Sequence, residues 1–240
     1  MISVCIASYN GAKYIKKQID SILRQLHNED ELVISDDSSI DETVNIVRLY
    51  DDKRIKLLTG YSFHSPIFNF ENAIKHSSGD IIVLSDQDDV WYENKIETLT
   101  RIFYSNPQSL LALHNYDIID GEGKIVMTKV YGENDITNDS FFKAVHKNKY
   151  IGCCMAFRRE LLKYILPFPE KIAMHDIWIG LMAKYMNKVV YCEEPLIFYR
   201  RHQNNFSSYT PFPLWYRIYY RLYILIRIIY RVHFQIGKLK

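Results

Sequence analysis

The chain has 240 residues, 48% hydrophobic and 24% charged, which is ordinary for a soluble globular protein of one large domain or of a domain with an appendage. Its net charge of +2 conceals an asymmetry, because no Asp or Glu follows Glu194 while eight Lys and Arg residues do. The first 194 residues therefore carry −6, and this acidic body argues against a nucleic-acid partner.

The four cysteines show no metal-ligand spacing, and Cys5 lies inside an apolar run. We therefore expect buried free thiols in a reducing compartment. A strand followed by a polar turn opens the chain, without the basic region and cleavage site of a signal peptide. The cytoplasm is the expected location.

Strands and helices alternate through the first 105 residues, which predicts a parallel, doubly wound sheet. Ser39 and Glu42 have the spacing of a capping box for one of the helices. The elements expected are a strand over 2–7, a helix over 15–26, a strand over 32–35, a helix after Ser39, a strand over 55–58, a helix through 70–74 that stops near Gly79, a strand over 81–84 and a helix over 92–105.

The second half is less regular, and its pattern predicts short elements. No repeat or low-complexity linker interrupts it, so we expect one domain over 1–210 and a tail over 211–240. The elements expected are strands over 110–114, 152–157, 189–192 and 196–199, a polar loop over 131–140, a short helix over 161–166 ended by Pro167, and a helix from Met174 to Tyr185.

Three of the expected strands end in polar turns, namely Ser8-Tyr9-Asn10, Asp36-Asp37-Ser38 and Asp86-Gln87-Asp88. Ligands bind outside the carboxyl ends of the strands in such sheets, so these turns predict a site. Asp86, Asp88 and Asp89 place three carboxylates within four positions, a charge that a divalent metal offsets well. The alternative is an acidic loop that caps the helix over 92–105.

These clusters, in this order, resemble the family 2 glycosyltransferases with the GT-A fold, over roughly residues 1–210. The form DQDDVW and the late form RHxxNxS look most like bacterial rhamnosyltransferase-type enzymes of surface polysaccharide assembly. The resemblance implies a Rossmann-like, mostly parallel sheet flanked by helices, with a nucleotide-binding half over 1–105 and an acceptor-side half over 106–210. The motifs that carry it are Ser8-Tyr9-Asn10-Gly11, Asp36-Asp37-Ser38-Ser39-Ile40-Asp41, Asp86-Gln87-Asp88-Asp89-Val90-Trp91, Gly152-Cys153, His175-Asp176-Ile177-Trp178 and Arg201-His202-Gln203-Asn204-Asn205-Phe206-Ser207.

The resemblance also implies roles for the donor side of the site. Asp88 would bind Mg²⁺ or Mn²⁺ bridging the diphosphate of a nucleotide sugar, and Asp86 would lie nearer the ribose. Asp89 is expected to cap the next helix, with a supporting role at the metal as the alternative. Asp37 would accept a hydrogen bond from the imide of uracil or thymine, unless it serves only in the turn. Ser8, Tyr9 and Asn10 would line the nucleoside pocket.

Asp176 is the expected general base, because a carboxylate beside bulky apolar residues can take the proton of an acceptor hydroxyl. The alternative for Asp176 is a helix cap, and the two roles are compatible. His202 would complete the metal shell or contact phosphate, or else be structural, while Arg201 would offset phosphate charge. Gly152 would let the backbone approach the sugar.

The tail mixes arginines with Tyr, Ile and Leu. At about 100° per residue, Arg217, Arg221, Arg227, Arg231 and Lys238 fall within an arc of about 120°. This pattern is typical of an interfacial helix on an anionic membrane, here over 214–240. The alternatives are a helix docked on the body and a contact in a homodimer.

We therefore expect an inverting glycosyltransferase that uses a dTDP-rhamnose or UDP-hexose donor and a divalent cation. The acceptor would be a saccharide or lipid-linked saccharide of O-antigen or capsule assembly, at the cytoplasmic face of the membrane. A sugar nucleotidyltransferase is the first alternative, but no glycine-rich, lysine-bearing loop follows the first strand. The second is a membrane-docked, non-catalytic glycan-binding protein, which the presence of Asp37, Asp88 and Asp176 argues against.

Overall fold

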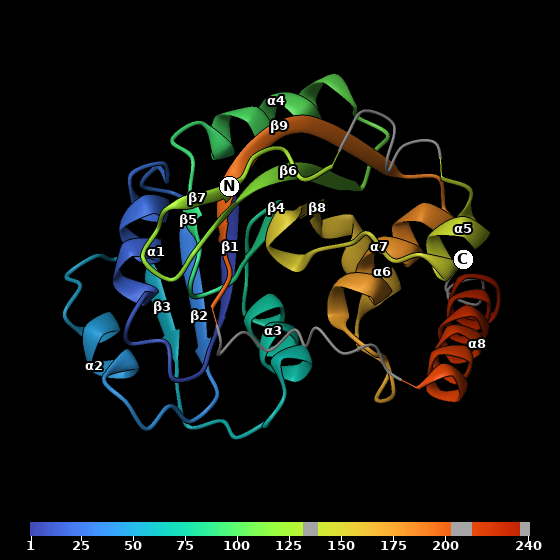
Figure 1. Ribbon diagram of the computed structural model, residues 1–240, viewed down its shortest axis with the longest axis horizontal. Helices are drawn as coiled ribbons and strands as arrows, with labels where there is room; N and C mark the ends of the chain where they lie inside the picture. Colours follow the sequence, from blue (N-terminus) through green and yellow to red (C-terminus); the bar gives the residue numbers. More distant parts are fainter. Residues whose placement is uncertain (132–138, 203–212, 236–240) are drawn as a thin grey trace.

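A computed structural model describes residues 1–131, 139–202 and 213–235. Its centre is a nine-stranded sheet in the order β3-β2-β1-β4-β8-β6-β9-β5, with β7 paired to β6 (Figure 1). The strands are β1 (Ile2–Ser8), β2 (Glu31–Asp36), β3 (Ile55–Leu58), β4 (Ile81–Ser85), β5 (Val90–Trp91), β6 (Leu111–Ile119), β7 (Ile125–Met127), β8 (Met155–Arg158) and β9 (Val189–Arg200).

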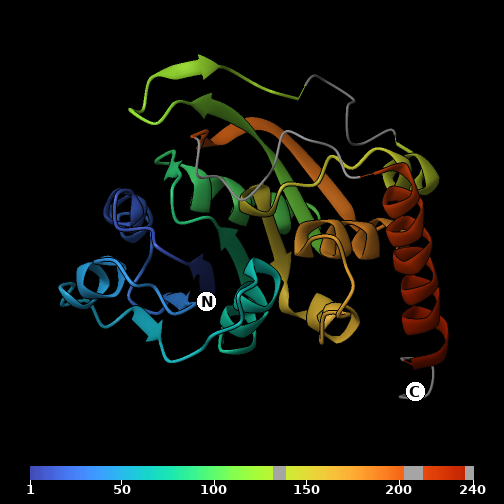
Figure 2. The same ribbon diagram turned by 60° about the horizontal axis from the view of Figure 1, so that its bottom comes forward.

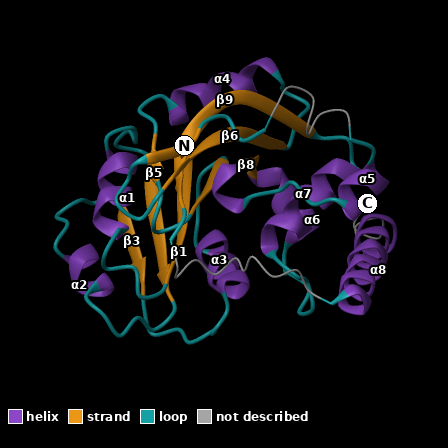
Figure 3. Ribbon diagram, in the orientation of Figure 1, coloured by secondary structure: helices purple, strands orange, loops and turns teal. Residues whose placement is uncertain are grey.

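Helices cover both faces of this sheet (Figure 3). One buried core holds apolar side chains of α1, α2 and α4, and the other holds those of α3, α6, α7 and α8. The helices are α1 (Ile15–Leu23), α2 (Thr43–Arg48), α3 (Pro66–Lys75), α4 (Lys95–Ser105), α5 (Phe141–His146), α6 (Leu162–Ile165), α7 (His175–Tyr185) and α8 (Leu214–Tyr230), with 3-10 turns η1 (Gly152–Cys154) and η2 (Arg159–Leu161) and a π-helical turn η3 (Arg231–Gln235).

The first half of the sheet confirms the predicted parallel arrangement. β1 pairs in parallel with both β2 and β4, and β2 with β3. The β-branched residues Val4, Ile34 and Val83 have no exposed surface, as expected for strands covered on both faces. Since these strands run in the same direction, the turns that follow β1, β2 and β4 meet at one edge of the sheet.

The second half of the sheet is mixed rather than parallel. β8 runs antiparallel to both β4 and β6, while β6 and β9 are parallel. The strands predicted over 189–192 and 196–199 form one strand, β9, whose register with β6 shifts twice. Beyond these shifts β9 also pairs with β5. Periodicity predicted neither β5 nor the exposed hairpin of β6 and β7, which projects from the body in Figure 2.

The predicted capping box of Ser39 and Glu42 is wrong. α2 begins at Thr43, after Glu42, and no side chain caps it. Ser39 instead donates its hydroxyl to Asp36 at 2.6 Å and accepts the backbone N–H of Asn10 at 2.8 Å. The Ser39 oxygen accepts the backbone N–H of Asn10 in place of an N–H at the start of a helix, and the bond to the Asp36 carboxylate holds the hydroxyl in this orientation.

Gly79 lies in the segment between α3 and β4, close to the backbone of β1. A substitution at this position tests how tightly this segment packs on β1. A Cβ at this position would lie 2.6 Å from the backbone nitrogen of Ser3 and 2.7 Å from the carbonyl carbon of Ile2. We expect Gly79→Ala to lower the free energy of unfolding by about 1–3 kcal/mol, because backbone cannot move aside cheaply. Chemical denaturation measures the loss.

The control for this substitution is Gly121→Ala, whose Cβ would meet its nearest neighbour, the Tyr14 hydroxyl, at 3.5 Å. The control variant should unfold at the wild-type denaturant concentration. Equal stability of the two variants would contradict the tight approach at Gly79.

Candidate active site

The turns that follow β1, β2 and β4 are joined by hydrogen bonds, as their polar sequences predict. The Ser8 hydroxyl donates to Asp36 at 2.8 Å. The backbone N–H of Tyr9 donates to Gln87 at 3.0 Å, and the Gln87 amide donates back to the Tyr9 carbonyl at 2.9 Å. A Cβ on Gly11 would lie 2.1 Å from the Gln87 side-chain oxygen, so only glycine permits this approach.

Asn10 fastens the first turn to the second. Its backbone φ is 48°, a left-handed conformation in which asparagine is tolerated. The Asn10 side chain accepts the N–H of Ile40 at 2.9 Å, while its own N–H donates to Ser39. Tyr9 and Asn10 are exposed above this junction, and Ser8 is buried within it. The three residues predicted to line the nucleoside pocket thus lie together at the sheet edge.

Asp37 is buried, and its carboxylate holds a neighbouring loop. One oxygen accepts the backbone N–H groups of Phe63 at 2.5 Å and His64 at 3.2 Å, and the other accepts that of Ser65 at 3.0 Å. The structure therefore gives Asp37 a turn-holding role of the kind considered as its alternative. The contact with a nucleotide base stays a prediction and would use the remaining lone pairs.

The carboxylates after β4 occupy different environments. Burial, followed by the charge of Asp88, raises the pKa of Asp86 to about 7. Asp89 is only 1% exposed, and burial raises its pKa well above the ordinary value. The expected cap role of Asp89 is wrong, because Asn94 precedes α4 and Asp89 accepts the backbone N–H of Arg200 at 2.9 Å. β9 passes beside this turn, so the Asp89 carboxylate accepts a backbone N–H of β9 instead of one at the start of α4.

Lys95 lies behind the acidic turn with no exposed surface. Its ammonium donates to the Cys153 carbonyl at 2.9 Å and lies 4.2 Å from the centre of the Trp91 ring. Burial lowers the pKa of Lys95 to about 8, and the neighbouring Cys154 and Cys153, followed by Asp89 and Asp86, oppose this effect. Lys95 is therefore a buried counter-charge for these carboxylates, which the helical pattern of α4 did not reveal.

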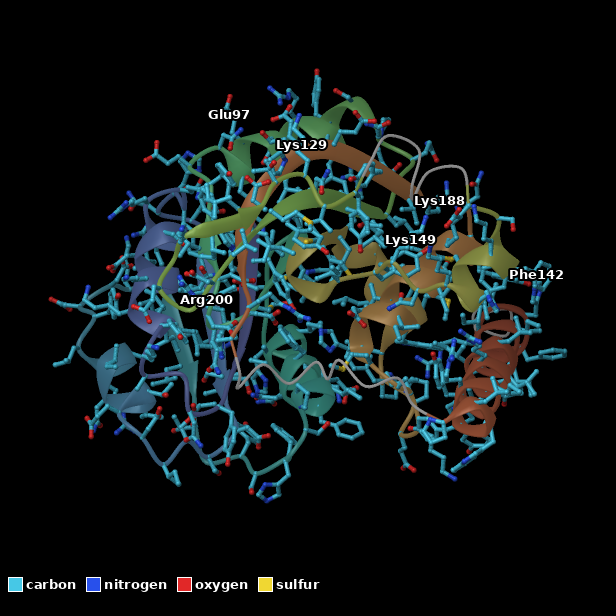
Figure 4. All side chains as sticks on the ribbon, in the orientation of Figure 1. Glu97, Lys129, Phe142, Lys149, Lys188 and Arg200 are labelled. Atoms are coloured by element: carbon cyan, nitrogen blue, oxygen red, sulfur yellow. The ribbon has the colours of Figure 1, made fainter. Side chains whose placement is uncertain are left out.

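The end of β9 brings basic residues to the same turn. Arg200 donates to the Asp88 carbonyl at 2.7 Å and to the Asp120 carbonyl at 3.0 Å, from a nearly buried position (Figure 4). The His202 ring nitrogen lies 2.8 Å from the Asp88 carboxylate. Arg201 is half-buried and packs over the Tyr199 ring. The predicted pair of Asp88 and His202 is thus brought together, while the part of this motif over 203–207 lies outside the described residues.

Asp176 occupies the first turn of α7 and is half-buried. Burial raises its pKa to about 7, the charge of Asp86 adds to this effect, and backbone hydrogen bonds from Ile177 and Gly152 oppose it. The helix cap is Met174, without a side-chain bond, so Asp176 is not the cap. The base predicted for the acceptor and the carboxylate predicted for the donor are therefore close enough to influence each other.

Gly152 and His175 form the wall beside Asp176. A Cβ on Gly152 would lie 2.8 Å from a ring nitrogen of His175, so this position has no room for a side chain. His175 is buried against Phe70, and burial lowers its pKa to about 3. Neither of its ring nitrogens has a hydrogen-bond partner within the described part of the chain. A neutral imidazole thus lies directly next to the candidate base.

Two groups of side chains at this turn have the chemistry to hold a divalent cation. On the outer side, Asp88 and His202 supply oxygen and nitrogen ligands at a partly exposed position. On the inner side, Asp86, Asp89 and Cys153 have ligand atoms within 4.8 Å of one another. Lys95 is buried next to Cys153, and its positive charge makes the inner group the less favourable of the two for a cation.

Comparison with known proteins identifies the family and the fold of the chain. The model of the family "Glycosyl transferase family 2" matches residues 3–166 of the chain. The chain therefore belongs to this family and is a glycosyltransferase. The mixed sheet and its helices form a GT-A-like fold, as predicted.

Curated relatives are identical to this chain at about a quarter to a third of the aligned positions. The chain is 30% identical to "UDP-Glc:alpha-D-GlcNAc-diphosphoundecaprenol beta-1,3-glucosyltransferase WfgD" of Escherichia coli, over 87% of this chain and 80% of the relative. It is 28% identical to "dTDP-rhamnosyl transferase RfbG" of Shigella flexneri, over 83% of this chain and 72% of the relative.

Solved structures at lower identity share the fold. S. aureus TarS 1–349 in complex with UDP-GlcNAc superposes with a TM-score of 0.76 at 20% identity, covering 95% of this chain and 66% of TarS. The mannosyltransferase PcManGT of Pyrobaculum calidifontis, in complex with GDP-Man and Mn²⁺, gives a TM-score of 0.60 at 20% identity, over 81% of this chain and 54% of PcManGT.

The raised pKa of Asp176 predicts an effect on stability with a definite sign. Because its folded-state pKa of about 7 exceeds the ordinary value of about 3.9, the native state binds this proton more tightly than the unfolded state. The free energy of unfolding then falls as pH rises from about 4 to 7. We expect Asp176→Asn to be more stable than wild type by about 1–3 kcal/mol at pH 8, and equal to it near pH 4.

Urea unfolding at both pH values, in the presence of EDTA, measures this difference. The control is Asp52→Asn, since hydrogen bonds from Arg54 lower the pKa of Asp52. That substitution should cost stability at pH 8 and not near pH 2. Destabilisation of Asp176→Asn at pH 8 would show that the carboxylate is not held at a desolvation cost.

Proposed function

We propose that the protein is an inverting glycosyltransferase that moves a sugar from a nucleotide-diphosphate donor to a hydroxyl group of a saccharide or lipid-linked saccharide. The observation that carries this proposal is the position of Asp176 beside the acidic turn after β4: its carboxylate accepts the backbone N–H of Gly152, and the side chain of the next residue, Cys153, lies within 4.8 Å of the Asp86 and Asp89 carboxyl groups. A base and a donor-binding carboxylate that lie this close can act on the two reactants of one transfer.

Asp176 is the proposed general base. A pKa of about 7 suits a group that must take a proton at neutral pH and be ionised beforehand. The acceptor hydroxyl would give its proton to Asp176 while its oxygen bonds to the anomeric carbon, and the bond to the diphosphate breaks on the opposite face. Gly152 is proposed to approach the sugar with its backbone beside this carboxylate, while His175 fills the space that a side chain on Gly152 would take.

The donor is proposed to lie across the three joined turns. Asp88 and His202, whose side chains lie 2.8 Å apart, would hold Mn²⁺ or Mg²⁺. When bound, this cation supplies charge that stabilises the departing diphosphate. Asp86 would contact the ribose, Asp37 the base and Arg201 the phosphate, with Ser8, Tyr9 and Asn10 lining the nucleoside. In this assignment the nucleotide-binding half covers 1–105 and the acceptor-side half 106–210.

The substrates are proposed from the relatives. WfgD acts on a diphosphoundecaprenol-linked sugar with UDP-Glc, and RfbG is a dTDP-rhamnosyl transferase. We infer a dTDP-rhamnose or UDP-hexose donor and an acceptor of O-antigen or capsule assembly for this chain. Such an acceptor places the enzyme at the cytoplasmic face of the membrane. Within the described residues, no helix has the length and apolar composition that a membrane span requires.

A donor panel with Mn²⁺ or Mg²⁺ tests this function through two substitutions that affect different steps. We expect Asp88→Ala to abolish stabilisation of the protein by donor and cation, since ligand binding raises the melting temperature. Asp176→Asn should keep this stabilisation and lower kcat by about 10²–10⁴-fold.

The matched control is Asp80→Asn, because Asp80 is exposed and pairs with the amino terminus at the start of β4, away from the turns. Its donor turnover should equal that of wild type. Turnover that survives both Asp88→Ala and Asp176→Asn would refute these roles. Release of pyrophosphate from a nucleoside triphosphate and a sugar phosphate would identify a nucleotidyltransferase instead.

A further inference from the structure

Helix α8 lies at one end of the molecule, against α5 and α7, as Figures 1 and 2 both show. Ile224 and Ile228 are buried in the core that α7 also lines. The helix is therefore docked on the body along one side, which was one of the alternatives considered for the tail. The lysines of the tail, Lys238 and Lys240, lie outside the described residues.

The docked side is the one that carries the arginines. Arg221 donates to the His146 carbonyl of α5. Arg231 is 4% exposed, donates to the Tyr164 carbonyl and lies 5.4 Å from the Trp178 ring centre. Arg217 and Arg227 are half-buried at the margins of this side. The arginine side therefore faces the protein and not the surroundings.

The opposite side of α8 is exposed and apolar. At about 100° per residue, its members span an arc of about 160° that contains no charged residue. They are exposed by between 39% and 70%: Leu214, Trp215, Ile218, Tyr219, Leu222, Ile226, Ile229 and Tyr230. Phe142 of α5 is 73% exposed and points outward at the same end of the molecule (Figure 4). We call the eight residues of α8 the α8 stripe.

We propose that the α8 stripe is the surface by which the protein lies on an anionic lipid bilayer, with the helix in the plane of the interface. This proposal rests on the proposed function in one respect, the lipid-linked acceptor. A continuous apolar stripe of this kind is larger than isolated exposed side chains and marks an interaction surface. The sequence pattern predicted a membrane contact, and in the structure the apolar side of the helix is the one left exposed.

Two features of the stripe favour a bilayer over a second copy of the chain. Trp215 and Tyr219 stand near one end and Tyr230 near the other, and such amphipathic rings favour the level of the lipid headgroups. Arg227 is half-buried and lies about 60° beyond Tyr230 around the helix, so its charge is near one border of the stripe and complements anionic headgroups. An apolar side bordered by a cation matches the arrangement of an interfacial helix.

Sedimentation with vesicles of phosphatidylcholine and phosphatidylglycerol tests the surface, using the full chain. The variant is Leu222→Glu with Ile226→Glu, two stripe positions that are 55% and 63% exposed. We expect wild type to sediment with the vesicles and the variant to lose at least tenfold in partitioning. The control is Leu49→Glu with Tyr104→Glu, which adds the same charge at positions that are 84% and 88% exposed, directly after α2 and on α4.

Unchanged sedimentation of the stripe variant, or no binding by wild type, would overturn the proposal. So would a wild-type dimer in lipid-free ultracentrifugation that the stripe variant dissociates, since that result assigns the stripe to a second copy. The melting temperatures of all variants should match, because the substituted side chains are exposed.

Donor turnover in the absence of lipid separates this proposal from the proposed function. The stripe variant should turn over donor at the wild-type rate, because no stripe residue belongs to the candidate active site. If vesicle binding behaves as expected while wild type turns over no nucleotide sugar, the surface stands and the function fails.

Discussion

Asp86, which is half-buried, and Asp89, which is buried, place two carboxyl groups beside each other, and the electrostatic cost of ionising them there shapes the surrounding structure. Each carboxylate has a raised pKa because burial removes the water that would stabilise it. Lys95 offsets this charge from behind, and the backbone N–H of Arg200 offsets it from the side. The outer carboxylate, Asp88, is left beside His202 at a partly exposed position. Asp86, Asp89 and Lys95 thus lie behind the partly exposed pair of Asp88 and His202, which is the candidate metal site.

β9 connects this acidic turn to the second half of the molecule. It begins beside β6, shifts register, and then pairs with β5 directly after Asp89. Arg200 at its end contacts the turns of both β4 and β6. The proposed nucleotide-binding and acceptor-side halves are therefore joined, because β9 pairs with a strand of each half, β5 and β6. β9 then ends at the candidate site. α7 then brings Asp176 to the same place from the other face.

Several parts of the site were predictable from the sequence because local rules govern them. Polar residues directly after buried strands had to emerge at one edge once the strands were parallel, and the turns after β1, β2 and β4 do so. Lys95 was missed, and the contacts that Gln87 and Arg200 make were not predicted, because their partners are distant in sequence. The prediction that Asp89 caps α4 was wrong for the same reason. Its carboxylate accepts the backbone N–H of Arg200 in β9, 111 residues away, instead of an N–H at the nearby start of α4.

The sequence by itself determined the family, the parallel half of the sheet, the positions of the acidic turn and of Asp176, and the uncharged side of the tail. Periodicity and motif spacing carry this information, because each depends on neighbours within a few residues. Only the tertiary structure decided that Asp37 holds the loop over 63–65, that Asp88 meets His202, and that the arginines of α8 face inward. These outcomes depend on which buried polar groups find partners, and long-range packing alone settles that competition.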